Sequence, residues 1–162
     1  MSAFVLRPLG AADSAWVERH VAEQWGSVVV VAHGATYRPA ELPGFVAEAE
    51  GEMVGLLTYH IDGDACEIVT LDSQREGQGI GTALIKAAEG AARQAGCRRL
   101  WLITTNDNTQ ALRFYQKRGF CLVAVRRDAV AASRAIKPEI PMIGNDGIPI
   151  RDEIELEMSL AE

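Results

Sequence analysis

Residues 76–84, which read EGQGIGTAL, constrain the fold more than any other stretch of the chain. Three glycines alternate here, Gly77, Gly79 and Gly81, and a run of good helix formers follows at once. The apolar and β-branched run at residues 66–71 precedes them and is typical of a strand. A glycine loop between a strand and a helix N-terminus gathers backbone N–H groups and the positive end of the helix dipole. Phosphate is the natural occupant, although a tight turn without a ligand has the same pattern.

The other elements are predicted from periodicity, capping residues and turn signals. Asp13 can cap a helix that ends at Gly26, a helix after the glycine loop can end at Gly96, and Asn108 can cap a third helix. Strands are predicted at residues 4–9, 28–32, 44–49, 53–60, 66–71, 100–105, 120–125 and 154–160. The strands from 28 to 71 should form an antiparallel meander. The fold class is therefore α+β, with a mixed, mostly antiparallel central sheet flanked by helices.

Size and composition limit the classes of protein. The 162 residues are predicted to form one domain, residues 1–162. The longest apolar run, residues 28–32, is far too short for a membrane span and no export signal is evident, so a cytoplasmic protein without membrane contact is expected. The three cysteines and three histidines lack the spacing of a disulfide framework or a metal site, and no metal is expected.

Charge is unevenly distributed along the chain. Residues 1–72 carry 3 basic and 11 acidic side chains, residues 73–137 carry 12 and 4, and residues 138–162 carry 1 and 7, within a net charge of -6. The basic segment begins with the glycine loop. A local positive field in an acidic protein suits a small polyanion better than a nucleic acid, so no nucleic acid partner is expected. Solvated faces that happen to cluster are the alternative explanation.

Two common phosphate-loop patterns do not fit. A Walker A loop needs a Gly-Lys-Ser/Thr ending that is missing here, and the dinucleotide pattern needs glycine where Thr82 stands. Residues 76–81 instead resemble the pyrophosphate loop, Arg/Gln-x-x-Gly-x-Gly/Ala, of the GCN5-related N-acetyltransferase (GNAT) family. Residues 106–120, NDNTQALRFYQKRGF, are similar to the second signature of that family. The resemblance implies the GNAT fold, acetyl-CoA as co-substrate and acyl transfer to an amine.

The resemblance also implies the residues that bind the cofactor. Backbone groups of Val69 and Leu71 would pair with the pantetheine arm, and the Leu71 N–H would polarise the acetyl carbonyl. Asn108 would hydrogen-bond the CoA arm while capping its helix. The pyrophosphate would contact the loop residues Glu76, Gly77, Gln78, Gly79, Ile80, Gly81 and Thr82.

Catalytic groups can be proposed on the same basis. Tyr115 is the family's usual general acid, since a phenol with a pKa of about 10 can protonate a thiolate, and a core tyrosine is the alternative. Alternation along residues 66–71 predicts that Glu67, Val69 and Leu71 share one face, so that Glu67 could take the amine proton through water, unless it is a surface carboxylate. Further candidates are Asp72 and His60 as bases and, less favoured, Cys66 as an acyl-carrying nucleophile.

One residue departs from the family pattern. Glu76 stands where the family has Arg or Gln, and it places an anion beside a phosphate site. An active N-acetyltransferase is therefore weighed against a non-catalytic CoA-binding regulatory module of the same fold and a phosphate-binding fold of unrelated chemistry. The acidic segments favour a cationic acceptor, either a small-molecule or a peptide amine. The segment 137–153 and the final strand can border the acceptor site or form a homodimer contact.

Overall fold

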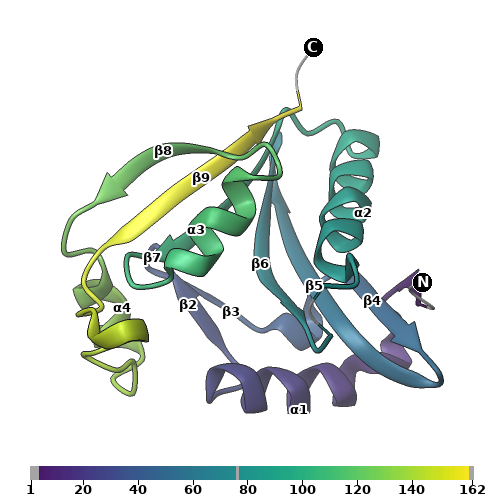
Figure 1. Ribbon diagram of the computed structural model, residues 1–162, viewed down its shortest axis with the longest axis horizontal. Helices are drawn as coiled ribbons and strands as arrows, with labels where there is room; N and C mark the ends of the chain where they lie inside the picture. Colours follow the sequence, from purple (N-terminus) through teal and green to yellow (C-terminus); the bar gives the residue numbers. More distant parts are fainter. Residues whose placement is uncertain (1–3, 76, 161–162) are drawn as a thin grey trace. The chain divides into compact units, whose positions relative to one another are not determined.

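The computed structural model describes residues 4–75 and 77–160, and Figure 1 shows their helices and strands. Its strands form a mixed, mostly antiparallel sheet with helices on its faces, which confirms the predicted fold class. The described residues divide into two compact units. The first unit comprises residues 4–30, 38–75, 77–100 and 159–160, and the second comprises residues 31–37 and 101–158.

The first unit is built on an antiparallel meander. Its strands β1 (Val5–Pro8), β4 (Gly44–Ala49), β5 (Glu52–Asp62) and β6 (Ala65–Ser73) lie side by side in that order. Each pairs antiparallel with the next, as the turn signals predicted for β4 to β6. Left-handed residues make the turns, with Glu50 and Gly51 between β4 and β5 and Gly63 between β5 and β6.

Two helices cover opposite faces of this meander. Helix α1 (Ser14–Trp25) packs Val17 and Val21 against Leu56 of β5, because its apolar residues recur at helical spacing. Helix α2 (Ile80–Gln94) approaches the preceding residue of the same strand, Gly55, so closely that a Cβ there would lie 2.7 Å from Ile80 Cγ2. Neighbouring residues of a strand point to opposite faces, so α1 and α2 lie on opposite sides of β5.

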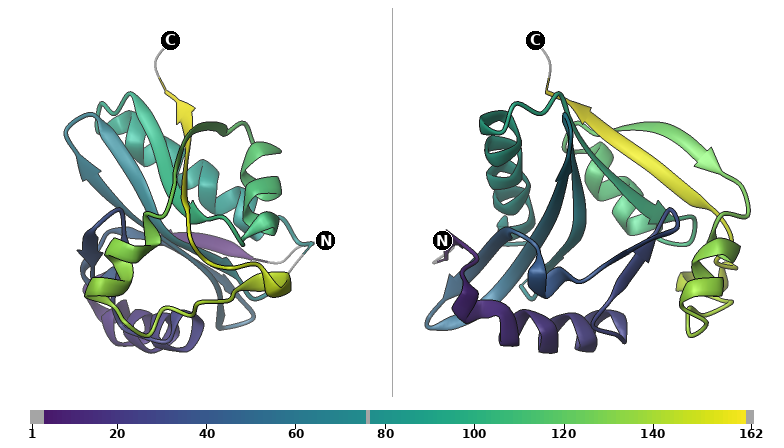
Figure 2. Two further views of the ribbon diagram at one scale, coloured as in Figure 1. Left: turned by 90° about the vertical axis from the view of Figure 1, so that its left-hand side faces the viewer. Right: turned by 180° about the vertical axis from the view of Figure 1, so that it is seen from behind.

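The second unit contains the C-terminal half of the fold. Its strands lie in the order β7 (Arg99–Thr105), β9 (Glu153–Ser159) and β8 (Cys121–Arg126), and β8 pairs antiparallel with β9. Helix α3 (Thr109–Gln116) precedes β8, and helix α4 (Val130–Ile136) and the short η3 (Asn145–Gly147) follow it. In both views of Figure 2, α4 lies beside the segment that leads to β9. Arg134 of α4 bonds the carbonyls of Pro141 and Ile150 in that segment.

Three local predictions need correction. The strand predicted at 28–32 does not extend the meander: β2 (Val30–Ala32) pairs with β3 (Ala35–Tyr37), which was not predicted. His33 and Gly34 form the turn with φ values of 43° and 77°, a conformation that an Asn-Gly signal would have revealed. Helix α4 was also missed. Asp13 stands before α1, but its carboxylate bonds Arg7 and the Gly10 N–H instead of capping the helix.

Candidate functional site

The glycine loop leads into α2 with an open side. Gly77 and Gly79 have φ values of 76° and 79°, so their backbone conformation favours glycine. Apart from the adjacent residues of the chain, no atom of the described residues lies within 4 Å of a Cβ built at either position. The first helical hydrogen bond joins the Ala83 N–H to the Gly79 carbonyl at 3.0 Å. The N–H groups of residues 80–82 therefore precede the helical ladder, which is the arrangement that an anion needs.

The predicted loop residues take different positions in this structure. Gln78 is exposed, whereas the Ile80 side chain is buried against the sheet, which leaves only its backbone for a ligand. Gly81 and Thr82 lie in the first turn of α2, so Gly81 does not use a left-handed conformation. Glu76 lies outside the described residues.

A β-bulge in β6 rearranges the predicted catalytic face. Thr58 and Tyr59 are adjacent on β5, but their partners on β6 are Thr70 and Ile68, so Val69 has no partner residue on β5. The bulge breaks the period of two. The prediction that Glu67, Val69 and Leu71 share one face is therefore wrong.

The pairing register shows which residues share a face instead. Leu56, Thr58 and His60 alternate along β5, and their partners on β6 are Asp72, Thr70 and Glu67, so all six side chains belong to the face covered by α1. Leu71 pairs with Leu57 and belongs to the opposite face. The three residues named as candidate bases, Glu67, His60 and Asp72, therefore lie on one face, and Glu67 is opposite His60 in the ladder. Glu67 is 3% exposed, so it is not a surface carboxylate.

Asp72 has a partner that the sequence did not reveal. His20 of α1 places Nε2 2.7 Å from Asp72 Oδ2, and the same oxygen accepts a bond from Gln74 at 2.8 Å. Trp16 stacks on the His20 ring with a centroid distance of 4.7 Å. Burial raises the pKa of Asp72, and the neighbouring His20 opposes that shift. His20 follows Trp16 by four residues on a helix, so helical spacing could have placed it on the buried face of α1.

Tyr115 and Asn108 lie in the second unit on the predicted helix. The Asn108 side chain accepts a bond from the Ala111 N–H at 3.2 Å, which confirms the predicted cap. Tyr115 is 8% exposed and its ring contacts those of Phe114 and Phe120 at centroid distances of 5.3 Å. Its hydroxyl forms no hydrogen bond with the residues that the structure describes. Burial raises the pKa of this phenol, so it stays protonated at neutral pH.

Cys66 does not have the character of a nucleophile. Its side chain is fully buried, and burial raises the pKa of the thiol to about 12. The thiolate is the reactive form, so this cysteine is inert at neutral pH. The structure therefore does not support Cys66 as an acyl-carrying nucleophile.

The first two residues of the second signature have a structural task that was not predicted. Asn106 Oδ1 accepts bonds from the Arg151 and Asp152 N–H groups, both at 2.9 Å, and its amide donates to the Pro149 carbonyl. Asp107 accepts a bond from the Asn145 N–H at 3.1 Å. These side chains therefore hold the proline-rich segment before β9.

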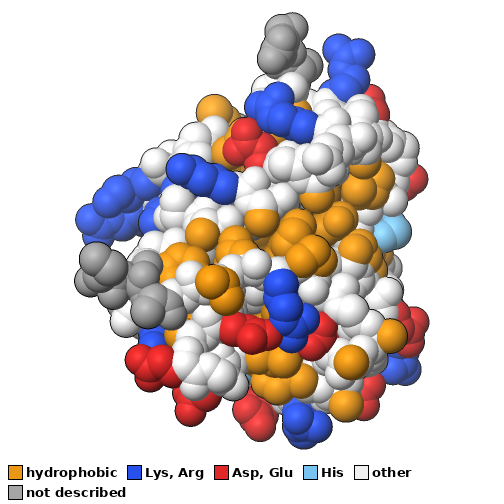
Figure 3. Space-filling model, turned by 90° about the vertical axis from the view of Figure 1, so that its right-hand side faces the viewer, with side chains coloured by type: hydrophobic (Ala, Val, Ile, Leu, Met, Phe, Trp, Pro, Cys, Tyr) orange, Lys and Arg blue, Asp and Glu red, His pale blue; other side chains and the backbone are white. Residues whose placement is uncertain are grey.

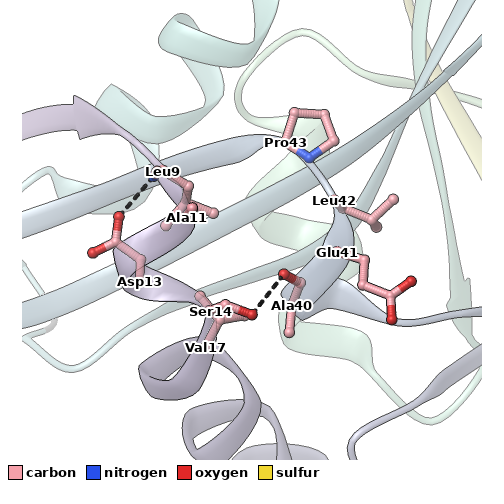
Figure 4. Close-up of a pocket in the computed structure, with 10 residues that line it drawn as sticks. Leu9, Ala11, Asp13, Ser14, Val17, Ala40, Glu41, Leu42 and Pro43 are labelled. Carbon is pink, nitrogen blue, oxygen red and sulfur yellow. Dashed lines mark hydrogen bonds between the residues drawn. The ribbon is translucent and has the colours of Figure 1, made fainter.

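A pocket in the first unit lies among other residues. It has a volume of about 450 Å³, and Figure 4 shows its lining around the start of α1 and η2 (Pro39–Glu41). Asp13 in its wall is bonded by Arg7, which lowers the pKa of this carboxyl to about 2, and Ser14 donates to the Ala40 carbonyl. No predicted site residue lines this pocket, and two of its polar groups already have protein partners.

Three further findings concern the surface, membrane-spanning helices and metal-binding groups. On the face that Figure 3 shows, hydrophobic side chains form a band across the middle and acidic side chains gather along the lower edge. Across residues 4–75 and 77–160, no helix is long and apolar enough to cross a membrane. Within the same ranges, the structure brings together no group of three or more His, Cys, Asp or Glu side chains that could hold a metal ion.

The chain is similar to known proteins in sequence and in structure. The model of the acetyltransferase (GNAT) family matches residues 12–120. The uncharacterized protein YdhI of Bacillus subtilis is 50% identical over 134 residues, or 82% of this chain and 84% of the relative. Aminoalkylphosphonate N-acetyltransferase of Salmonella typhimurium is 36% identical over 84 residues, or 46% of this chain and 54% of the relative. A GNAT family acetyltransferase from Elizabethkingia anophelis, solved with acetyl-CoA bound, has a TM-score of 0.69 at 22% identity and covers 99% of this chain and 100% of its own.

Proposed function

Because the chain belongs to the acetyltransferase (GNAT) family, we propose that it is an acetyl-CoA-dependent N-acetyltransferase that acts on a primary amine. The observation that carries this proposal is the glycine loop at the start of α2, whose open side and helix N-terminus suit a pyrophosphate. A neighbour of the same fold binds acetyl-CoA, and a relative over part of the chain is an N-acetyltransferase by name. Both support the same co-substrate and reaction.

The cofactor is assigned to backbone groups more than to side chains. Residues 77–82 would bind the pyrophosphate, while Val69 and Leu71 would pair with the pantetheine arm and Asn108 would bond it. The bulge supports this assignment because Val69 has no partner residue on β5. Since backbone N–H groups suffice for the phosphates, Glu76 need not prevent binding if its side chain points to solvent.

The reaction is proposed as direct attack. The neutral amine attacks the acetyl carbonyl carbon, the Leu71 N–H stabilises the oxyanion, and the C–S bond then breaks to release the CoA thiolate. Tyr115 donates a proton to the thiolate, which its unbonded hydroxyl supports. The amine loses its proton through water to Glu67, and the products are an N-acetyl amide and CoA. The shared face of Glu67 and His60 supports this location for the base.

The acceptor is proposed to be a cationic small-molecule or peptide amine. The acid-rich segments before residue 73 and after residue 137 support this choice, because they favour ligands of the opposite charge. The cytoplasmic location, the single domain and a homodimer contact stay predictions.

Calorimetric titration with acetyl-CoA tests the proposal, with ATP and NADH as controls for loops that bind other phosphates. We expect acetyl-CoA to bind with a Kd on the order of micromolar and both controls to show no binding. An amine panel assayed for released CoA then tests turnover. Absence of acetyl-CoA binding would mean that the loop is disabled, whereas binding without turnover on any amine would favour the non-catalytic regulatory module.

A further inference from the structure

A histidine and a carboxylate meet between α1 and the sheet of the first unit. His20 of α1 lies with its Nε2 2.7 Å from Asp72 Oδ2 of β6, and Gln74 donates to the same oxygen. The Trp16 ring covers the His20 ring in a stack with an angle of 11° between the two planes. His20 is buried, so these contacts hold its ring in one orientation.

The two ring nitrogens of His20 have different surroundings. An ionised carboxylate only accepts hydrogen bonds, so Nε2 carries the hydrogen that points to Asp72 and Nδ1 keeps its lone pair. Nδ1 has no hydrogen-bond partner among residues 4–75 and 77–160. Across the same residues, Asp72 Oδ1 is the buried polar side-chain atom that lacks a partner, and Nδ1 does not share its burial. The lone pair of Nδ1 therefore reaches solvent, as a base that takes a proton from a substrate requires.

The buried oxygen of Asp72 favours a positive charge on the ring. Because Oδ1 receives no donor within the described part of the chain, His20 and Gln74 are the side chains that bond this carboxylate. A buried carboxylate with few donors is stabilised when its neighbour becomes a cation. A carboxylate behind a catalytic imidazole fixes the tautomer of the ring and stabilises the imidazolium that forms, and Asp72 has the geometry for both tasks.

The position of the pair in the chain connects it with the proposed acetyl transfer. Asp72 directly follows Leu71, whose N–H is proposed to stabilise the oxyanion. Asp72 belongs to the face of β6 that α1 covers, together with Glu67, while Leu71 belongs to the opposite face. His20 therefore lies beside the strand position that would bind the acetyl carbonyl, on the same face as the proposed base.

We propose that His20 accepts the first proton of the incoming ammonium and that Asp72 positions its ring. Acetylation of a protonated amine removes two protons from its nitrogen, one before the attack and one after it. His20 Nδ1 takes the first proton and later releases it to water. The neutral amine attacks the thioester, and its second proton leaves through water to Glu67, which balances the proton that Tyr115 gives to the thiolate. The scheme rests on the proposed function and adds the residue that makes the acceptor neutral.

Two amines of similar shape test this role. Ethylamine is almost entirely protonated at neutral pH, whereas trifluoroethylamine is neutral because its fluorines withdraw electrons. Both are assayed by CoA release with the unmodified protein and with His20→Gln, whose amide keeps a donor for Asp72 but takes no proton from an ammonium. We expect His20→Gln to lower kcat/KM by about 100-fold for ethylamine and by less than about threefold for trifluoroethylamine, which needs no base before the attack.

Two further variants complete the comparison. His33→Asn is the control, because His33 is an exposed histidine in the β2–β3 turn without a proposed role, and asparagine tolerates its left-handed backbone. It should leave kcat/KM unchanged for both amines. Asp72→Asn removes the charge behind the ring and should lower kcat/KM for ethylamine more than for trifluoroethylamine. Thermal unfolding verifies that each variant is folded.

A second measurement on the unmodified protein needs no acceptor. NMR of protein with isotopically labelled histidine reports which ring nitrogen carries a hydrogen, and the His20 signals are assigned by their absence from His20→Gln. At neutral pH we expect the hydrogen on Nε2 and a lone pair on Nδ1. In Asp72→Asn the new amide can donate to Nε2, so the hydrogen should move to Nδ1.

The outcomes separate this role from the proposed function. Equal losses for the two amines in His20→Gln would show that the pair only holds α1 against the sheet, and would refute the role of His20 alone. A hydrogen on Nδ1 of the unmodified protein at neutral pH would refute it as well. If the unmodified protein releases CoA with neither probe nor any amine of the panel, the proposed acetyl transfer is refuted and His20 loses its substrate. Should a panel amine react where ethylamine does not, that amine and its fluorinated analogue replace the pair.

Discussion

At the scale of single residues, the candidate site contains groups whose pKa values are raised by burial. Tyr115 contacts two phenylalanine rings, and burial raises the pKa of its phenol, which therefore stays protonated at neutral pH. Asp72 is half-buried beside His20, and its Oδ1 has no hydrogen-bond partner among residues 4–75 and 77–160. Groups with pKa values shifted by burial are common at functional sites, which is consistent with the proposed roles.

Replacing Tyr115 with phenylalanine tests its proposed role. The ring contacts remain, so we expect acetyl-CoA to bind as before while kcat falls by about 100-fold or more, the usual contribution of a general acid. Calorimetry and CoA release provide the two measurements. Tyr59→Phe is the control, because Tyr59 lies on the opposite face of β5 from Glu67 and has no proposed role. Unchanged turnover in Tyr115→Phe would remove this residue from the mechanism.

At the scale of elements, the position of α2 determines where the glycine loop presents its N–H groups. The helix packs onto β5 at Gly55, where the absence of a side chain lets Ile80 and Leu84 approach the strand. Ile80 is also the first residue of α2, so the contact lies directly beneath the loop. The close packing at Gly55 therefore helps to fix the position of the glycine loop before α2.

A Gly55→Ala variant should disturb this contact. Its Cβ would lie 2.7 Å from Ile80 Cγ2, a stiff branched methyl, and we expect a loss of about 1–3 kcal/mol in the free energy of unfolding. Acetyl-CoA affinity should fall as well, because the start of α2 must shift. Gly90→Ala is the matched control: it lies in the same helix with open space around it and should stabilise the protein by up to about 1 kcal/mol. Denaturant unfolding measures the free energy of unfolding, and calorimetry measures acetyl-CoA affinity. Equal stability of the two variants would contradict the proposed contact between Gly55 and Ile80.

At the scale of the whole molecule, the proposed reaction uses residues of both compact units. The loop, Glu67 and Leu71 belong to the first unit, while Asn108 and Tyr115 belong to the second. This assignment follows from the family and its two signatures.

Acetyl-CoA should slow amide hydrogen exchange in both units. We expect protection in peptides that cover residues 77–83 and in peptides that cover the start of α3, because a ligand that binds only the folded state suppresses local opening. Peptides from β8 serve as the internal control and should change little. Protection confined to the first unit would show that the second signature does not bind the cofactor, and the roles of Asn108 and Tyr115 would then be withdrawn.

Features that depend on neighbouring residues could be predicted from the sequence. The glycine loop before α2, the Asn108 cap and the turns of the meander follow from backbone conformation and short-range hydrogen bonds, which a few consecutive residues specify. The two signatures indicated the family for the same reason. Helix α4 and the β2–β3 hairpin were missed because short elements with weak turn signals depend on packing.

The folded structure was needed to show which side chains share a face and which charged groups pair. The bulge at Val69 moves Glu67 to the face of Asp72, and strand alternation cannot reveal it because the extra residue is defined by pairing with β5. His20 and Asp72 meet although 52 positions separate them in the chain. Arg126 is the partner residue of Glu153 in the β8–β9 ladder, yet its guanidinium bonds Glu155. Burial and charge pairing arise from contacts between distant segments, so they are properties of the folded chain and not of any local pattern.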